Sequence, residues 1–270
     1  WGWQRRYTQQ NPEYEQRIWK QFTDQYYVTL PEVVQEYAPE SFYWPSSPFA
    51  RYDSGSDDRN GDRHYWNVWH SKEPINSYNK ARSRFFSEYG FQSFPEFESV
   101  KRYAPYPEDW DIYSEVMMSH QRGAHANGLI ETYLLNEYRQ PKDFEAFLYM
   151  NHVLQGDAIK TAIEAHRRDM PYCMGTLFWQ HNDCWPVASW ASRDYYGRWK
   201  AQHYFARQAY RDLLVSPIAD EEGMLNIYVV SDRPASCSGT LDVKVIKLTG
   251  EIISDFRQTV KIAANTSRKL

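Results

Sequence analysis

The 270-residue sequence lacks the features that mark several large protein classes. It has only 3 cysteines, Cys173, Cys184 and Cys237, which are too few for a disulfide framework. No apolar run approaches the length of a membrane span, so we expect no membrane insertion. The formal net charge is −4 and there is no basic run, which argues against a nucleic-acid partner.

Aromatic residues are what the sequence has in excess. They make up 17% of the chain and include 11 Trp and 22 Tyr. Trp and Tyr join a flat apolar face to a polar edge, so they suit surfaces that are partly wet. Pyranose rings present apolar C–H faces and hydroxyl rims, which makes carbohydrate the ligand class that fits best. We nevertheless expect most of these aromatic residues to belong to the ordinary core.

Strands and helices alternate along the first 216 residues. The pattern predicts strands at 41–48, 64–69, around Glu88 and at 173–180. It predicts helices at 13–38 with an interruption at Pro31, at 78–83, at 95–103, within 113–170 and at 199–214. Such alternation is typical of parallel β/α units. Four units are half of the eight in a closed (β/α)8 TIM barrel, so the predicted α/β fold is a partial barrel.

The pattern changes after Pro217. Residues 225–232, 239–248 and 251–262 alternate apolar and polar side chains, and turn residues separate the last two segments. This alternation predicts the start of an antiparallel, Ig-like β-sandwich with about three strands. We therefore expect a barrel portion at 1–215 and an incomplete sandwich domain at 216–270.

One carboxylate stands inside a strongly aromatic stretch. Glu88 lies in RFFSEYGFQSFP, residues 84–95, among phenylalanines and a tyrosine. An ionised carboxylate in apolar surroundings costs several kcal/mol unless partners satisfy it. Glu88 is therefore either a solvated or salt-bridged acid at the end of a strand, or an acid held for chemistry.

Polar and aromatic residues also end the other predicted strands. In a parallel β/α barrel these ends converge on one face, which would bring Trp66, His70, Trp179 and Asn182 to Glu88. Trp66 and His70 are four residues apart and would face the same side of a strand. A carboxylate in an aromatic pocket suits a glycosidase, since indole faces hold the sugar while the acid attacks the anomeric carbon or activates water. The alternatives are core packing for Trp66 and Trp179, and loop capping for His70.

Several long motifs together resemble one family. SEYGFQSFP, GTLFWQHNDCWPVASW, DYYGRWKAQHYFA, YWPSSP and GDRHYWNVW look like the second half of a β-mannosidase of glycoside hydrolase family 2, from Trp1 to about residue 216. The resemblance implies a (β/α)8 catalytic barrel flanked by β-sandwich domains, of which these strands are the fifth to the eighth. It also implies a retaining mechanism with Glu88 as the nucleophile at the end of the seventh strand.

The resemblance leaves the second catalytic carboxylate outside this sequence. In the family the acid/base glutamate follows an asparagine, shortly before a Trp-Gly-Trp stretch similar to Trp1-Gly2-Trp3. Asn136-Glu137 does not fit, because it lies in a helical stretch after Glu88. We expect the acid/base to precede Trp1 and this chain to be inactive by itself. Trp1 resembles a tryptophan of the family's sugar-binding subsite.

The function implied is exo-hydrolysis of terminal non-reducing β-D-mannose from β-mannoside oligosaccharides. Neither a cofactor nor a metal is expected, since His120, His125, His152 and His166 lack metal-ligand spacing. The partner implied is the remainder of the same protein, namely the first barrel half and its sandwich domains. Family members are secreted, periplasmic or lysosomal, and these residues do not choose among those compartments.

Other interpretations stay open from the sequence. The family's sister activities, β-galactosidase, β-glucuronidase and exo-glucosaminidase, share the barrel, and a non-catalytic sugar-binding relative would keep the aromatic pocket. Four residues of the 183–199 region are expected to be structural, fixing the loop after the eighth strand: Asp183, Asp194, Arg198 and Trp199. Asn265-Thr266-Ser267 forms a glycosylation sequon.

Overall fold

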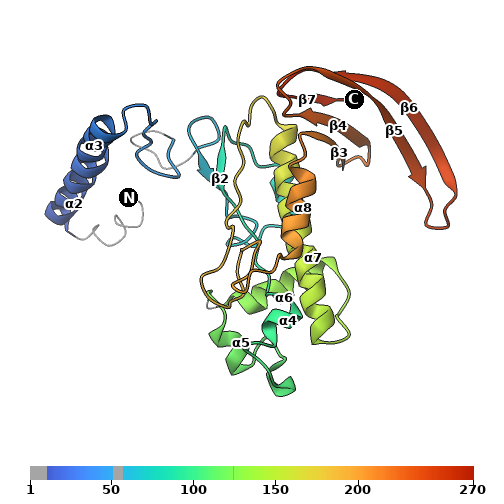
Figure 1. Ribbon diagram of the computed structural model, residues 1–270, viewed down its shortest axis with the longest axis horizontal. Coiled ribbons are helices and arrows are strands. Elements are labelled where there is room, and N and C mark those ends of the chain that lie inside the picture. Colours follow the sequence, from blue (N-terminus) through green and yellow to red (C-terminus); the bar gives the residue numbers. More distant parts are fainter. Residues whose placement is uncertain (1–10, 51–56, 124) are drawn as a thin grey trace. The chain divides into compact units, whose positions relative to one another are not determined.

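A computed structural model describes residues 11–50, 57–123 and 125–270 (Figure 1). The chain forms two compact units, one of Trp1–His64 with Ser83–Ser87 and the other of Tyr65–Arg82 with Glu88–Leu270. Within the described ranges, no helix is both long enough and apolar enough to cross a membrane.

A nearly continuous helix comes first in the described part of the first unit. It comprises α2 (Pro12–Asp24), the π-helical turn η1 (Gln25–Thr29) and α3 (Leu30–Tyr37). The Asn11 side chain caps α2 by accepting a hydrogen bond from Tyr14 N–H at 3.1 Å. Pro31 lies in the first turn of α3, where its missing N–H is tolerated. The predicted interruption is therefore a change of helix type.

Two short strands lead to Glu88. They are β1 (Arg63–His64) and β2 (Phe86–Glu88), which pair with each other. The prediction of a strand at 41–48 is wrong, because that segment forms no ladder, and its prolines lack the N–H that a ladder needs.

The predicted strand at 64–69 is mostly a turn. His70 N–H donates to Trp66 C=O at 2.7 Å and Ser71 N–H donates to Asn67 C=O at 3.1 Å, which is helical spacing. Trp66 and His70 do share a face, but the reason is this turn and not the alternation of a strand.

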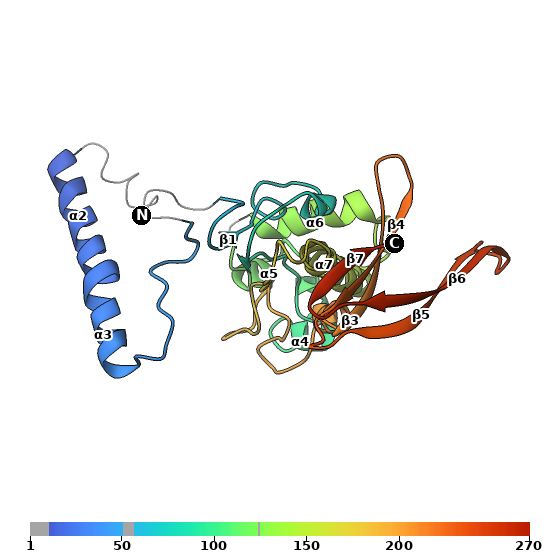
Figure 2. The same ribbon diagram turned by 90° about the horizontal axis from the view of Figure 1, so that it is seen from above.

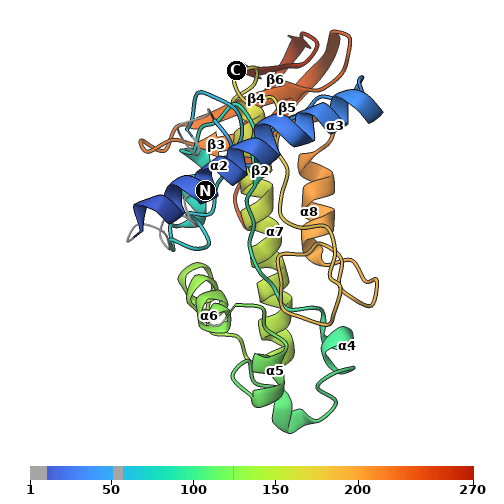
Figure 3. The same ribbon diagram turned by 90° about the vertical axis from the view of Figure 1, so that its left-hand side faces the viewer.

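Helices form most of the second unit before residue 210. They are the 3-10 turn η2 (Ile75–Asn79), α4 (Phe97–Val100), the 3-10 turn η3 (Pro107–Asp109), α5 (Glu115–Ser119), α6 (Ala126–Glu137), α7 (Phe144–Arg168) and α8 (Ala201–Ala209). The predicted helices in 113–170 are thus confirmed as three. Figures 1 and 3 show α4, α5 and α6 at the N-terminal end of α7 and the C-terminal strands at its other end.

The long helix α7 organises this unit. The Asp143 side chain caps it through Ala146 N–H at 2.8 Å, and His166, Arg167 and Arg168 occupy its last turn, where cations are favourable. α8 packs along α7 (Figure 3). A Cβ on Gly156 would lie 2.7 Å from the Phe205 ring, so this glycine permits the close approach of the two helices.

The predicted strand at 173–180 is extended without forming a named strand. A strand is defined by its ladder partners. This segment meets Tyr89, just after β2, through the bond from Trp179 N–H to Tyr89 C=O at 2.7 Å and through the hydroxyls of Thr176 and Tyr89 at 2.8 Å. The helix predicted to reach residue 214 ends at Ala209, because β3 begins at Leu213.

The C-terminal region is a pair of antiparallel sheets. Its strands are β3 (Leu213–Ala219), β4 (Leu225–Ser231), β5 (Cys237–Ile246), β6 (Ile252–Ile262) and β7 (Thr266–Lys269). One sheet has the order β3-β4-β7 and the other is the β5–β6 hairpin, which extends away from the first sheet (Figure 2). The three predicted strands are confirmed as β4, β5 and β6, whereas β3 and β7 were not predicted.

A small aliphatic core joins the two sheets. It consists of Val229, Leu241, Val260 and Ile262. Each of these side chains is at most 8% exposed, so the inward faces of β4, β5 and β6 exclude water there.

Candidate active site

The Glu88 carboxylate ends β2 and has an aromatic partner. Trp66 Nε1–H donates to Glu88 Oε2 at 3.2 Å, and Tyr65 N–H donates to the Glu88 backbone carbonyl at 2.8 Å. The Glu88 side chain is half-buried while Phe86, two residues earlier on the same strand, is buried. Glu88 is therefore an acid at a strand end, held by an indole N–H and partly accessible.

Three rings gather beside this carboxylate. The Trp66 ring lies 5.2 Å from His70 and 5.9 Å from Trp190, measured between centroids, and His70 lies 6.5 Å from Trp190. Partial burial lowers the pKa of His70, which favours the neutral imidazole. The structure thus brings the predicted residue Trp66 to Glu88 and places His70 against the Trp66 ring, together with Trp190, which the sequence analysis did not single out.

Gly90 makes room for this cluster. A Cβ on Gly90 would lie 2.6 Å from the Trp179 carbonyl oxygen, 2.8 Å from Trp190 Cδ1 and 3.0 Å from Trp66 Cη2. Real Cβ atoms do not approach so closely, so only glycine fits here.

Trp179 enters the same neighbourhood through its backbone. Its N–H bonds to the carbonyl of Tyr89, the residue that follows Glu88, and Trp179 as a residue is 43% exposed. The Trp179–Gln180 peptide bond is cis. Asn182 is exposed and forms an isolated bridge with Arg193, so its backbone belongs to the 180–199 loop. Trp1 lies outside the described residues.

Buried polar side chains hold the segment that follows Glu88. Asn151 Oδ1 accepts from Phe94 N–H at 2.9 Å, Gln155 Nε2 donates to Phe91 C=O at 2.8 Å, and His152 Nε2 lies 2.8 Å from Phe94 C=O. All three residues come from α7 and are buried. These positioning residues were missed, because helical periodicity does not reveal that a polar side chain serves a backbone some 60 residues away in the chain.

Lys200 fastens the same segment from the other side. Its ammonium donates to Ser93 C=O at 2.8 Å and to Ser189 C=O at 3.1 Å. Burial lowers the pKa of Lys200 to about 8, although the charges of Asp183 and Asp194 oppose the shift. One buried cation thereby joins the segment after β2 to the loop that follows Trp179.

The residues expected to be structural do make loop contacts. Asp194 accepts from Arg198 N–H at 2.9 Å and from the Ser99 hydroxyl, and the Arg198 guanidinium pairs with Glu96 at 2.7 Å. The Trp199 ring stacks on His203 at 3.9 Å between centroids. These contacts connect the 183–199 region to the start of α4.

The first unit contains a separate polar cluster around Asp62. Ser47, Ser87, Trp44 and the Phe49 N–H all donate to this buried carboxylate, and Ser47 donates at 2.6 Å. Burial by itself would raise the pKa of Asp62, but these hydrogen bonds together lower it. The tryptophan and serine of the predicted strand end at 41–48 therefore have a partner that strand patterns did not predict.

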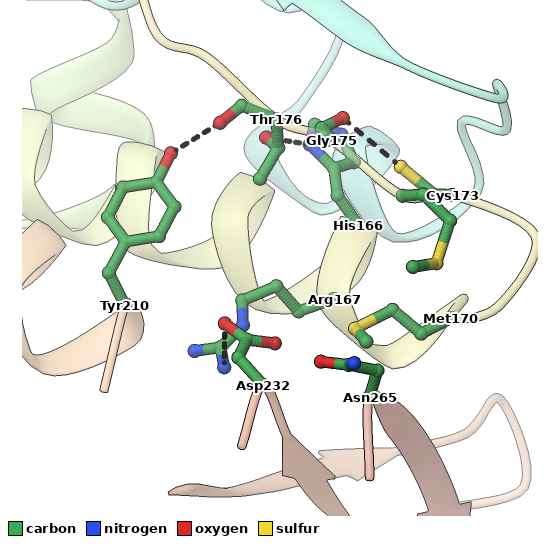
Figure 4. Close-up of a pocket in the computed structure, with 10 residues that line it drawn as sticks. His166, Arg167, Met170, Cys173, Gly175, Thr176, Tyr210, Asp232 and Asn265 are labelled. Carbon is green, nitrogen blue, oxygen red and sulfur yellow. Dashed lines mark hydrogen bonds and ion pairs between the residues drawn. The ribbon is translucent and has the colours of Figure 1, made fainter. Parts of the chain in front are cut away.

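A cavity of about 270 Å³ lies at the C-terminal end of α7 (Figure 4). Its polar groups mostly bond to one another: Tyr210 donates to Thr176 C=O at 2.8 Å, the His166 ring contacts the Thr176 hydroxyl, and Arg167 pairs with Asp232 at 2.9 Å. Most of the polar groups of this cavity are thus engaged with one another, although the buried Arg167 Nε has no hydrogen-bond partner among the described residues.

A second cavity, of about 480 Å³, adjoins the ring cluster beside Glu88, since both His70 and Trp190 line it. Among residues 11–50, 57–123 and 125–270, no group of three or more His, Cys, Asp or Glu side chains is arranged to hold a metal.

Comparison with known proteins identifies the relatives of this chain. The family described as Mannosidase Ig/CBM-like domain matches residues 223–270, which is the sandwich region from β4 onward. Beta-mannosidase B of Aspergillus terreus is 35% identical over 255 residues, covering 87% of this chain and 30% of that protein. Beta-mannosidase B of Aspergillus fumigatus is 31% identical over 235 residues, covering 81% of this chain and 28% of that protein.

Solved structures agree with these relatives. A β-D-mannosidase from Dictyoglomus thermophilum superposes with a TM-score of 0.82 at 32% identity, over 92% of this chain and 30% of that one. An exo-chitosanase from Amycolatopsis orientalis shares the fold, with a TM-score of 0.61 at 18% identity over 73% of this chain and 25% of that one. The chain spans less than a third of the length of each of these proteins. It therefore belongs to glycoside hydrolase family 2 and forms part of a longer, β-mannosidase-type member.

Proposed function

We propose that the chain is the second half of the catalytic domain of a retaining exo-β-mannosidase, with the first part of the following sandwich domain. Residues 1–215 would supply the last four units of a (β/α)8 barrel, and residues 216–270 the start of an Ig-like sandwich. The observation that carries the proposal is the Glu88 carboxylate at the end of β2, bonded to the Trp66 indole beside Trp190 and His70.

Glu88 is the proposed nucleophile. One carboxylate oxygen attacks the anomeric carbon of a terminal β-mannoside, and the bond from that carbon to the leaving oxygen breaks with its electron pair on the oxygen. A carboxylic acid protonates that oxygen and, as carboxylate, later takes a proton from the water that displaces Glu88. In retaining enzymes the two carboxyl groups stand about 5–5.5 Å apart.

The resemblance assigns this acid/base to a residue that precedes Trp1. The 270-residue chain alone is therefore proposed to be inactive, and the parent protein to be active. Trp66, Trp179 and His70 are the proposed walls of the sugar pocket, with Trp1 as a further wall. An indole face suits the apolar C–H side of a mannose ring.

Covalent trapping tests the proposal. The full-length protein is treated with an activated 2-fluoro-mannoside, which slows breakdown of the glycosyl-enzyme, and the labelled peptide is mapped. The expected result is one label on Glu88. A label on any other residue, or hydrolysis with inversion at the anomeric carbon, would refute the assignment.

A second candidate is exo-glucosaminidase activity, since the exo-chitosanase of Amycolatopsis orientalis shares this fold. The mannosidase relatives are more similar in sequence, which favours mannose. Rates on 4-nitrophenyl β-mannoside, β-glucosaminide, β-galactoside and β-glucuronide separate the candidates. A protein that binds mannosides and hydrolyses none of the four would instead be a sugar-binding relative.

A further inference from the structure

The cavity beside the ring cluster contains a buried amide without a partner. Gln92 lines this cavity and its side chain is fully buried, at 0% exposed. Neither its amide nitrogen nor its amide oxygen has a hydrogen-bond partner among the described residues. Buried amides in folded proteins are nearly always satisfied, so a group like this one points to a ligand that completes its hydrogen bonds.

The described lining of the cavity carries one lysine and two imidazoles. Lys72, His70 and His125 line it, and the described lining contains no Asp or Glu. The first turns of α6 form another part of the wall, and the N-terminal end of a helix carries partial positive charge. The electrostatic environment therefore favours an anion.

Lys72 occupies an unfavourable backbone position. Its φ is +60°, at the end of the turn in which Glu73 N–H bonds to Asn67 C=O at 3.0 Å. This left-handed position usually holds glycine or asparagine, and a lysine there costs free energy. Strain of this kind is retained where a side chain has a task, and here the side chain lies at the cavity.

The cavity adjoins the ring cluster beside Glu88. His70 and Trp190 line the cavity and also contact Trp66, whose indole N–H bonds to Glu88. The volume of about 480 Å³ falls within the range of small-molecule sites, roughly 300–1,000 Å³. This adjacency would let one glycoside reach both the cavity and Glu88.

We propose that this cavity binds an anionic group on a sugar unit joined to the mannose that Glu88 would release. The ammonium of Lys72 and the imidazoles of His70 and His125 face the anion, the Gln92 amide bonds a ring hydroxyl, and the Trp69 and Trp190 indoles flank the ring. The identity of the released sugar rests on the function proposed above, whereas binding of the anion does not.

Direct binding is the first test, because it needs no catalysis. The full-length protein is titrated with methyl β-glucuronoside, glucose 6-phosphate and methyl β-glucoside as carboxylate, phosphate and neutral probes. At least one anionic probe should bind about tenfold more tightly than the neutral one, since hydrogen bonds to charged groups are stronger than neutral ones. Which anion binds best then distinguishes a uronic acid from a sugar phosphate.

Matched variants locate the binding. Lys72→Gln should weaken anion binding about tenfold, and Gln92→Leu should weaken all three probes with an unchanged melting temperature. Lys142→Gln removes an exposed lysine outside the cavity, paired with Asp143, and should change nothing. Equal affinity for neutral and anionic probes, or anion affinity that survives both Lys72→Gln and His125→Gln, would overturn the proposal.

Kinetics connect the cavity to the substrate. Mannosyl-β-1,4-glucuronate and mannosyl-β-1,4-glucose differ in one carboxylate, and the wild type should prefer the first in kcat/KM through a lower KM. Lys72→Gln should abolish the preference without altering the rate on 4-nitrophenyl β-mannoside. Anion binding without mannoside hydrolysis would defeat the proposed function alone. If the glucuronoside is the anionic probe that binds, hydrolysis with no preference for the acid would defeat the cavity assignment alone.

Discussion

Two regions of the second unit hold their shape by different means. The segment after Glu88 is fixed by buried polar contacts, in which Asn151, Gln155 and Lys200 bond to backbone groups at 2.8–2.9 Å. The sandwich region has only a small aliphatic core and carries several exposed apolar side chains on β5 and β6. Hydrogen bonds impose direction and distance, whereas apolar contacts tolerate repacking.

The difference indicates which part of the chain has to hold its atoms in fixed positions. If Glu88 acts as the proposed nucleophile, its geometry must hold to within a fraction of an ångström, and the buried polar side chains that fix the following segment are of the kind that provides this. The sandwich needs only to stay folded. Substitutions around Glu88 should therefore change function, whereas substitutions in the sandwich region should change local stability.

Removing the carboxylate should have the largest effect. We expect Glu88→Gln in the full-length protein to lower kcat on 4-nitrophenyl β-mannoside by about 10⁴-fold or more, because the amide cannot act as a nucleophile. The fold should be retained, since the amide oxygen can still accept the Trp66 N–H. Glu98→Gln, at an exposed acid of α4, is the matched control. Retention of more than a few per cent of activity by Glu88→Gln would contradict the nucleophile assignment.

Acid should weaken the polar region next. Burial, helped by the charge of Lys200, lowers the pKa of His152 to about 4 from its usual 6.5. The unfolded chain then binds the proton more readily than the folded one, so stability is complete above pH 6.5 and falls as pH drops toward 4. The shift corresponds to about 3 kcal/mol.

The measurement is urea unfolding followed by tryptophan fluorescence between pH 7 and pH 4. Position 152 cannot titrate in His152→Gln, so the free energy of unfolding of this variant should change with pH by about 3 kcal/mol less than that of the wild type. The difference between the two proteins gives the contribution of His152 alone. Parallel pH profiles for wild type and variant would mean that His152 is not buried in its neutral form.

Opening the sandwich core should have a smaller and purely local effect. We expect Leu241→Ala to cost about 2 kcal/mol, the low end for such substitutions, because a small core can partly collapse around the cavity. Hydrogen exchange of peptides from β4 to β6 should speed up while kcat stays the same. If kcat fell as strongly as protection from hydrogen exchange in β4 to β6, the proposed difference between the two regions would be wrong.

A surface substitution should have the smallest effect. Phe256 on β6 is 49% exposed, so Phe256→Ser should change stability by less than about 0.5 kcal/mol. Exchange of the same peptides measures it. A cost as large as that of Leu241→Ala would show that Phe256 is covered by another part of the full-length protein.

The sequence predicted the parts of the structure that depend on local patterns. Helical periodicity predicted helices within 113–170, the region that contains the 25-residue α7, and alternation predicted strands β4, β5 and β6. In each case the residues that decide the structure are neighbours in the chain.

Local sequence patterns could not predict contacts between segments that are distant in the chain. Residues 64–69 read as a strand because they are aromatic, yet the backbone turns after Trp66. The sequence did not predict a role for Trp190 or for Gln92. No neighbouring residue indicates that Trp190 contacts Trp66 or that Gln92 lines a cavity. Partners of this kind become visible only once the chain is folded.

The close fit around Gly90 has a consequence for how this protein can change over time. The position after Tyr89 accepts no side chain, because even a methyl group would drive the Trp179 carbonyl and two indoles apart. A mutation that replaces Gly90 would therefore disrupt the packing of Trp66, Trp179 and Trp190 around this position, even though Glu88 itself is unchanged. The smallest residue of the neighbourhood should tolerate replacement as poorly as the acid does.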